Sequence, residues 1–210
     1  MLRGQQSAIY GSDAIGGVIQ YITLGGRDAP GGVARIEAGS FGTVNGAARV
    51  AGYSGDLDYA LSATVNTTDG TPSARNGTRD LANDSGAVSL KTTFAPTSNV
   101  RLTGVLRYAR TDAEFNDSDS DPASPTFGFQ VDSPGNRFEN EAIYALVRGE
   151  LNLLDDHWTH ALSAQIADTR RDGFVSTGRS YGSEGQRLKG SYDTTLRIEA
   201  GGLTLSLIHI

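Results

Sequence analysis

Hydrophobic and polar residues alternate with a period of two along most of the chain from about residue 32 onward. In residues 57–66, Leu57 and Leu61 share one side of an extended chain, and Asp58 and Ser62 share the other. A period of two places successive side chains on opposite faces of a β-strand. The pattern therefore predicts an all-β, antiparallel fold. The same alternation recurs in residues 88–94, 100–109, 143–153 and 188–200, with glycine-rich or polar breaks between the segments.

The breaks between these segments alternate in length. Short connections are predicted at residues 40–42, 53–56, 96–99 and 154–156, and long ones at residues 67–86, 112–137 and 172–187. In an antiparallel sheet, this order places the long loops at one end of the strands and, except for residues 40–42, the tight turns at the other. A soluble β-sandwich also has alternating strands, but such asymmetric connections are typical of an outer-membrane β-barrel.

Several aromatic residues lie near the ends of the predicted strands. They are Tyr53, Tyr59, Phe94, Tyr108 and Trp158. Membrane barrels concentrate aromatic side chains in girdles at the level of the lipid headgroups. Aromatic residues also favour any β-strand, so this placement alone leaves both interpretations open.

Composition favours strands and turns over a helical core. Hydrophobic residues make up 38% of the 210 residues, and 27 glycines stand beside a single Met and no Cys. A chain without Cys has no disulfides, thiolate metal sites or cysteine nucleophiles. No apolar run reaches the roughly 18 to 20 residues of a transmembrane helix, whereas alternating barrel strands of about 9 to 11 residues leave no such run. The net charge of −6, with basic residues scattered among acidic ones, argues against nucleic-acid binding.

The strongest local signal is at the front of the chain, where residues 2–23 read LRGQQSAIYGSDAIGGVIQYIT. This segment resembles the end of the plug domain of TonB-dependent outer-membrane receptors, in which a run of the form R-G-P-x-S-x-L-Y-G-x-x-A-x-G-G-x-I-N-x-x-T precedes the barrel. The spacing matches throughout, and Gln5, Ile9 and Gln20 are the departures. The matching residues of the motif are Arg3, Gly4, Ser7, Tyr10, Gly11, Ala14, Gly16 and Gly17.

The glycines of this motif suit compact turns, because glycine tolerates positive φ and close backbone approach. We expect the motif to shape the plug rather than to touch substrate. Neither a P-loop nor a dinucleotide-binding spacing is present, which argues against a phosphate site. Residues 12–17 resemble the version found in cobalamin receptors.

The resemblance implies a domain order. Residues 1–24 are expected to be the C-terminal end of a plug domain, residues 25–32 a linker, and residues 33–204 about eight strands of a transmembrane barrel that the family usually builds from 22. If the plug side is periplasmic, the periplasmic connections are those at residues 53–56, 96–99, 154–156 and 201–202, and all four are short. No signal peptide is visible, and we expect residues 205–210 to be a non-native tail and the chain to be a fragment that does not close alone.

The acidic loop between residues 112 and 132 is a candidate metal site. Asp117, Asp119 and Asp121 alternate in a way that can aim several carboxylates at calcium, and the resemblance makes calcium worth considering. Pro122 and Gly128 stand where an EF-hand needs Gly and Glu, so an EF-hand is excluded. The other interpretation is a solvated acidic loop.

For His157, Trp158 and His160, interfacial anchoring is a better interpretation than a metal or catalytic group. No nucleophile elbow or other catalytic spacing occurs, so we do not expect an enzyme.

The function implied by the resemblance is energy-coupled uptake of a scarce nutrient, such as cobalamin or a ferric siderophore, across the outer membrane of a Gram-negative bacterium. The implied partners are TonB, the small-molecule substrate and outer-membrane lipid. The alternatives are a passive or adhesive outer-membrane β-barrel without energy coupling and a secreted β-sandwich or solenoid that binds a surface ligand.

Overall fold

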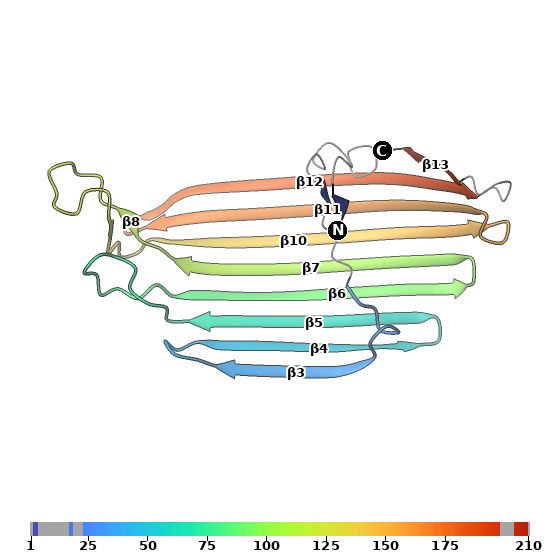
Figure 1. Ribbon diagram of the computed structural model, residues 1–210, viewed down its shortest axis with the longest axis horizontal. Coiled ribbons are helices and arrows are strands. Elements are labelled where there is room, and N and C mark those ends of the chain that lie inside the picture. Colours follow the sequence, from blue (N-terminus) through green and yellow to red (C-terminus); the bar gives the residue numbers. More distant parts are fainter. Residues whose placement is uncertain (1, 4–16, 19–22, 198–203, 210) are drawn as a thin grey trace.

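A single antiparallel sheet makes up most of the computed structural model, which describes residues 2–3, 17–18, 23–197 and 204–209 (Figure 1). Each strand pairs with its neighbours along the chain, in the order β13-β12-β11-β10-β7-β6-β5-β4-β3. The predicted all-β, antiparallel fold is confirmed. The strands are β3 (Gly31–Ala38), β4 (Val44–Ser54), β5 (Leu57–Thr68), β6 (Asn83–Thr97), β7 (Val100–Glu114), β10 (Arg137–Leu153), β11 (Trp158–Val175), β12 (Gly178–Arg197) and β13 (Thr204–His209).

The sheet is open in the part of the chain that the structure describes, because β3 and β13 lie at its two edges and do not pair with each other. Two short two-stranded sheets complete the fold: β1 (Leu2–Arg3) pairs with β2 (Gly17–Val18), and β8 (Asp117–Ser118) pairs with β9 (Gln130–Val131). In the described ranges, no helix is long and apolar enough to cross a membrane.

The connections fall at two ends of the sheet, seen at the right and left of Figure 1. At the turn end, residues 55–56, 98–99 and 154–157 join consecutive strands. At the loop end, residues 69–82 and 115–136 form long loops, as the sequence predicts. The short connection of residues 39–43 also lies at the loop end, as the sequence predicts for residues 40–42.

The predicted long loop at residues 172–187 is wrong. Strand β11 continues to Val175 and β12 begins at Gly178, so only residues 176–177 connect them. The prediction failed because the apolar alternation stops near Ile166 and Leu188, while the pairing of the two strands continues well beyond those residues. A paired strand with two polar faces carries no period-two signal.

The strand register sorts the side chains of β3 to β12 into two faces. One row of directly opposed residues runs across the sheet as Val50, Leu61, Leu90, Leu106, Ala145, Ile166 and Leu188. The face that carries this row is called the apolar face below. The opposite, polar face carries Asp58, Lys91, Arg107 and Arg148. The predicted separation of apolar and polar residues within single strands thus extends across the whole sheet.

No second layer covers the apolar face in the described structure. The only buried hydrophobic residues in the described ranges are four alanines, Ala51, Ala60, Ala113 and Ala161, and the register places all four on the polar face. The chain exposes 14018 Å², whereas a folded monomeric protein of this mass exposes about 9,300 Å². The excess is what a sheet one layer thick produces, because both of its faces remain accessible.

A short segment, residues 23–30, crosses the polar face before the chain enters β3. We call it the strap. Gly26 and Arg27 donate their backbone N–H groups to the two carboxylate oxygens of Asp58 in β5, at 2.6 and 2.7 Å. Arg49 in β4 donates to the Ala29 carbonyl at 2.7 Å. Lys91 in β6 donates to the Thr23 carbonyl at 2.6 Å, so the strap is held by strands β4, β5 and β6.

Close packing against the sheet requires glycine in the strap. A Cβ atom on Gly26 would overlap the carbonyl oxygen of Gly52 in β4. Gly25 and Gly26 are both buried. The predicted linker thus has a defined position on the polar face, and the first strand begins at Gly31, two residues before the expected start.

Candidate membrane-facing surface and loop clusters

Large hydrophobic side chains form an exposed belt across the apolar face. Leu61 is 40% exposed, Leu106 49%, Val147 64% and Leu188 79%. Solvent-exposed apolar patches on soluble monomers rarely exceed a few hundred Å². An apolar belt across eight neighbouring strands therefore marks this face as a surface that contacts an apolar medium or partner. The belt comprises Ile36, Val50, Leu57, Tyr59, Leu61, Val65, Val88, Leu90, Phe94, Leu102, Leu106, Tyr108, Ile143, Val147, Leu151, Trp158, Leu162, Ile166, Leu188, Tyr192 and Leu196.

The belt has a limited height along each strand. In β5 it runs from Leu57 to Val65, and in β10 from Ile143 to Leu153, a half-buried residue on the same face. These stretches of nine and eleven residues match the roughly 9 to 11 residues with which a tilted β-strand crosses a bilayer. Beyond Val65 and Ile143, toward the loop end, the same face becomes polar.

An aromatic cluster borders the belt at the turn end. The rings of Trp158 and His160 lie 4.4 Å apart, and the Trp158 indole N–H donates to the Thr194 hydroxyl at 3.0 Å. His160 Nδ1 and the Tyr192 hydroxyl share a hydrogen bond of 2.6 Å. These side chains combine an apolar body with a satisfied polar tip, as residues at a membrane interface do. The geometry of the His157–His160 region therefore suits the interfacial anchor that the sequence predicts.

Two of the five aromatic residues named from the sequence have unexpected positions. Tyr53 pairs with Asp58, so it lies on the polar face, where the Arg27 guanidinium stacks 4.7 Å from its ring. Tyr108 lies in the middle of β7, because that strand continues to Glu114. Tyr108 nevertheless marks the border of the belt in β7 on the side of the loop end.

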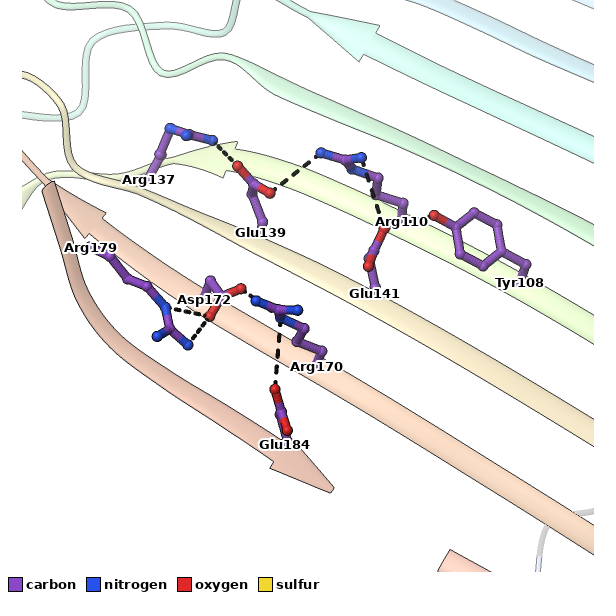
Figure 2. Close-up of polar contacts among 9 residues, drawn as sticks. All are labelled: Tyr108, Arg110, Arg137, Glu139, Glu141, Arg170, Asp172, Arg179 and Glu184. Carbon is purple, nitrogen blue, oxygen red and sulfur yellow. Dashed lines mark hydrogen bonds and ion pairs between the residues drawn. The ribbon is translucent and has the colours of Figure 1, made fainter. Parts of the chain in front are cut away.

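Beyond Tyr108 the apolar face carries an array of charged side chains, which we call the ion-pair ladder (Figure 2). The register aligns its members in rows across neighbouring strands. One row alternates in sign and consists of Arg110, Glu141, Arg170 and Glu184. The next row toward the loop end is entirely acidic and consists of Asp84, Asp112, Glu139 and Asp172.

Arginines on both sides pair with three members of this acidic row, Asp112, Glu139 and Asp172. Arg137 pairs with Glu139 and lies 2.9 Å from Asp112, and Arg110 lies 3.3 Å from Glu139. Asp172 accepts hydrogen bonds from Arg170 at 2.9 Å and from Arg179 at 2.7 Å. Tyr108 joins the ladder to the belt by donating its hydroxyl to Glu141 at 2.9 Å.

The ladder explains why the strands extend past the belt. Its ion pairs connect β7 to β10 and β11 to β12, beyond the last apolar residues of the belt. Sequence reasoning missed the ladder because its members lie far apart along the chain. The only signal was the replacement of apolar by charged residues at every second position after Tyr108 and before Ile143.

The two long loops at the loop end are packed against each other. Arg79, from residues 69–82, donates to the Phe115 carbonyl at 3.0 Å and to Asn116 Oδ1 at 3.1 Å, and pairs with Glu114 at 3.2 Å. Asp132 accepts the backbone N–H groups of Thr78 and Arg79 in the other loop, at 2.9 and 3.2 Å. The loops therefore form one ordered unit.

Asp117, Asp119 and Asp121, the residues of the predicted calcium site, lie in this unit but engage separate partners. Asp117 accepts from the Asn136 amide at 2.8 Å, and Asp119 accepts from the Thr126 hydroxyl at 2.6 Å. Asp121 accepts from the backbone of Ala123. No group of three acidic or histidine side chains in the described ranges is arranged to hold a metal ion, and calcium binding stays a prediction.

Hydrogen bonds lower the pKa of the Asp119 carboxyl below its ordinary value. The contributors, in order of size, are the hydroxyls of Ser124 and Thr126 and the backbone N–H of Asp121. Each donates to the charged form of the carboxylate. Asp119 thus acts as the internal anchor of the loop tip.

The structure places only part of the front motif. Arg3 and Gly17 are directly opposed in the β1–β2 pair. Gly4, Ser7, Tyr10, Gly11, Ala14 and Gly16 lie outside the described residues.

No protein-family model matches this sequence, and no curated protein matches it. The function proposed below therefore rests on these surfaces and on the resemblance of the front motif. An exposed belt with aromatic and charged borders suits contact with a layer that is apolar in the middle and polar at its edges.

Proposed function

We propose that this chain forms part of the wall of an outer-membrane β-barrel and belongs to a TonB-dependent receptor that takes up a scarce nutrient. The observation that carries the membrane proposal is the exposed apolar belt on one face of a one-layer antiparallel sheet. A lipid bilayer is the environment in which such a face is stable without a second sheet.

The height of the belt supports this proposal quantitatively. Ten residue steps separate Ile143 from Leu153 in β10, which is about 33 Å along the strand at ~3.3 Å per residue. A strand tilt of about 40° reduces this to about 25 Å, the usual height of the apolar band of outer-membrane barrels. The ladder and the loop end then project outside the cell, and the turn end faces the periplasm.

The strap supports the proposed position of the plug. It lies on the polar face, which is the lumen side if the apolar face contacts lipid. The strap thus begins on the lumen side, where a plug domain would sit. Together with the front motif, this favours a receptor of the TonB-dependent family over a barrel without a plug.

Uptake of cobalamin or a ferric siderophore is the activity that the family resemblance supports. The direct test uses the protein expressed from its complete gene in a host that lacks its own receptors. Uptake of radiolabelled cyanocobalamin or ferric siderophore is compared in cells with and without TonB. Uptake that requires TonB supports the proposal, and uptake that is equal in both strains contradicts it.

The main alternative is a passive or adhesive barrel, and it has the same lipid-facing belt. It predicts solute entry or cell adhesion that does not depend on TonB. A secreted β-sandwich or solenoid is a further alternative, and it predicts that the protein remains soluble without detergent.

A further inference from the structure

A second aligned row of side chains crosses the polar face near the loop end. Its members bear amide or hydroxyl groups, and the strand register places them directly opposite one another in β4, β5, β6, β7 and β10. We call this the amide–hydroxyl row. It consists of Asn45, Asn66, Ser85, Thr111 and Asn140.

Small side chains create a hollow beside this row. The adjacent row on the same face, two residues toward the turn end, consists of Ala47, Thr64, Ala87, Ala109 and Ala142. A cavity of about 370 Å³ lies over the first four strands of the two rows. A volume of this size falls in the range of small-molecule sites.

The polar groups of the row are available to a ligand. In the described part of the chain, the side chains of Asn45, Asn66, Ser85 and Thr111 make no hydrogen bond to another residue, and Asn45 and Asn66 are exposed. The four side chains are neutral, and each can both donate and accept. The charged side chains that line the hollow on this face, Arg35 and Glu37, pair with each other.

We propose that this hollow binds a neutral molecule rich in hydroxyl or amide groups. This inference rests on the proposed function, because it assigns the lumen side of the wall to substrate. A row of groups that donate and accept matches hydroxyls and amides, which do the same. An anion would find no unpaired cation in the hollow, and an apolar ligand would leave the polar groups without partners, which is unfavourable.

The position of the hollow is consistent with entry from outside the cell. The strap occupies the turn end of the polar face, whereas the hollow lies at the loop end of the same face. A ligand that arrives past the loops would therefore meet the hollow before the strap.

Equilibrium binding to outer membranes that contain the protein from its complete gene tests the inference. The probes are maltotriose as the hydroxyl-rich molecule, cyanocobalamin as the amide-rich molecule and ferric citrate as the anionic comparison. We expect saturable binding of maltotriose or cyanocobalamin and none of ferric citrate. The double variant Asn45→Leu and Asn66→Leu keeps the side-chain size and removes the polar groups, and it should weaken binding about ten-fold or more.

Three single variants separate binding from folding. Ser85→Ala should weaken binding several-fold, whereas Ser85→Thr keeps the hydroxyl on a β-branched side chain and should retain it. Ser89→Ala, on the same face of β6 but four residues nearer the turn end, is the matched control and should bind normally.

The inference is overturned if neither neutral probe binds, if ferric citrate binds instead, or if the Asn and Ser85 variants bind as well as the unchanged protein. In that case the row faces another occupant, such as the N-terminal part of the same chain. A protein that reaches the outer membrane and imports its nutrient through TonB, yet fails these tests, contradicts only the inference. A protein absent from the outer membrane contradicts the proposed function itself.

Discussion

At the residue scale, the turn at residues 154–157 shows how one connection is built under backbone strain. Leu154, Asp155 and Asp156 all have left-handed φ angles, of 54°, 52° and 67°. Each such residue costs roughly 1–2 kcal/mol unless it is glycine. A sequence predicts that a turn lies here, but it does not reveal the strain, because Leu is an unusual choice for this conformation.

Replacing Leu154 by Gly should therefore stabilise the protein. Leu154 is 68% exposed, so little packing is lost, and the gain should be about 1 kcal/mol. Gly55 has a φ of 55° in the turn between β4 and β5 and is the matched opposite case. Gly55→Ala should destabilise by a similar amount. Urea unfolding in lipid vesicles measures both, and equal effects of the same sign would contradict the strain argument.

Asp119 should make the tip of residues 115–136 sensitive to acid. Its pKa is lowered in the folded protein by the hydroxyls of Ser124 and Thr126. A carboxyl with a lowered folded pKa stabilises fully above its ordinary value of about 3.9, and this stabilisation is lost as pH falls through the folded pKa. Amide hydrogen exchange, corrected for intrinsic rates, should accelerate at the tip in that window. Asp119→Asn should remove the pH dependence, and an unchanged pH profile would contradict the role.

At the element scale, strands β11 and β12 are longer than their apolar pattern indicates. The sequence predicts the parts of these strands that lie in the belt, because only there does one face differ from the other. It does not predict the extensions, since these are held by ion pairs between residues distant along the chain. For the same reason, the sequence does not predict the ladder. The loops at residues 69–82 and 115–136 are predicted from their polar composition.

The ladder should protect the loop end of β11 and β12 from local opening. Asp172 receives hydrogen bonds from Arg170 and Arg179, so Asp172→Ala should remove the carboxylate that joins the two arginines and accelerate hydrogen exchange at residues 172–182 several-fold. Glu184 is 4.0 Å from Arg170 and its side chain is 74% exposed, so Glu184→Gln is the control and should change little. Equal exchange in the two variants would show that the ladder does not hold the strands.

The two faces of β5 should respond differently to charge. Leu61 lies at the centre of the belt, and Leu61→Lys should destabilise by about 2–4 kcal/mol if the belt is in lipid. Thr64 lies on the polar face of the same strand between two alanines, and Thr64→Lys should change stability by less than about 1 kcal/mol. Unfolding free energies in vesicles decide the comparison. Equal costs would indicate that both faces meet water.

At the scale of the whole molecule, the sheet exposes an apolar belt on one face and carries the strap and the amide–hydroxyl row on the other. Within each strand, the alternation of apolar and polar residues is enough to predict that the two faces differ. The alignment of the faces across eight strands depends on the register, which is set by turn geometry and strand pairing. The proposal of a receptor family rests on the resemblance of the front motif, and the proposal of a membrane-spanning wall rests on the sheet.

Site-directed spin labels along β10 test the central claim most directly. Single labels from position 143 to position 152, in outer-membrane vesicles that contain the protein, report access to oxygen in lipid and to a water-soluble nickel complex. We predict that odd-numbered positions from Ile143 to Leu151 are accessible to oxygen, and that even-numbered positions from Tyr144 to Asn152 are not. Access of the nickel complex to the odd-numbered positions, or no alternation at all, would contradict a lipid-facing wall.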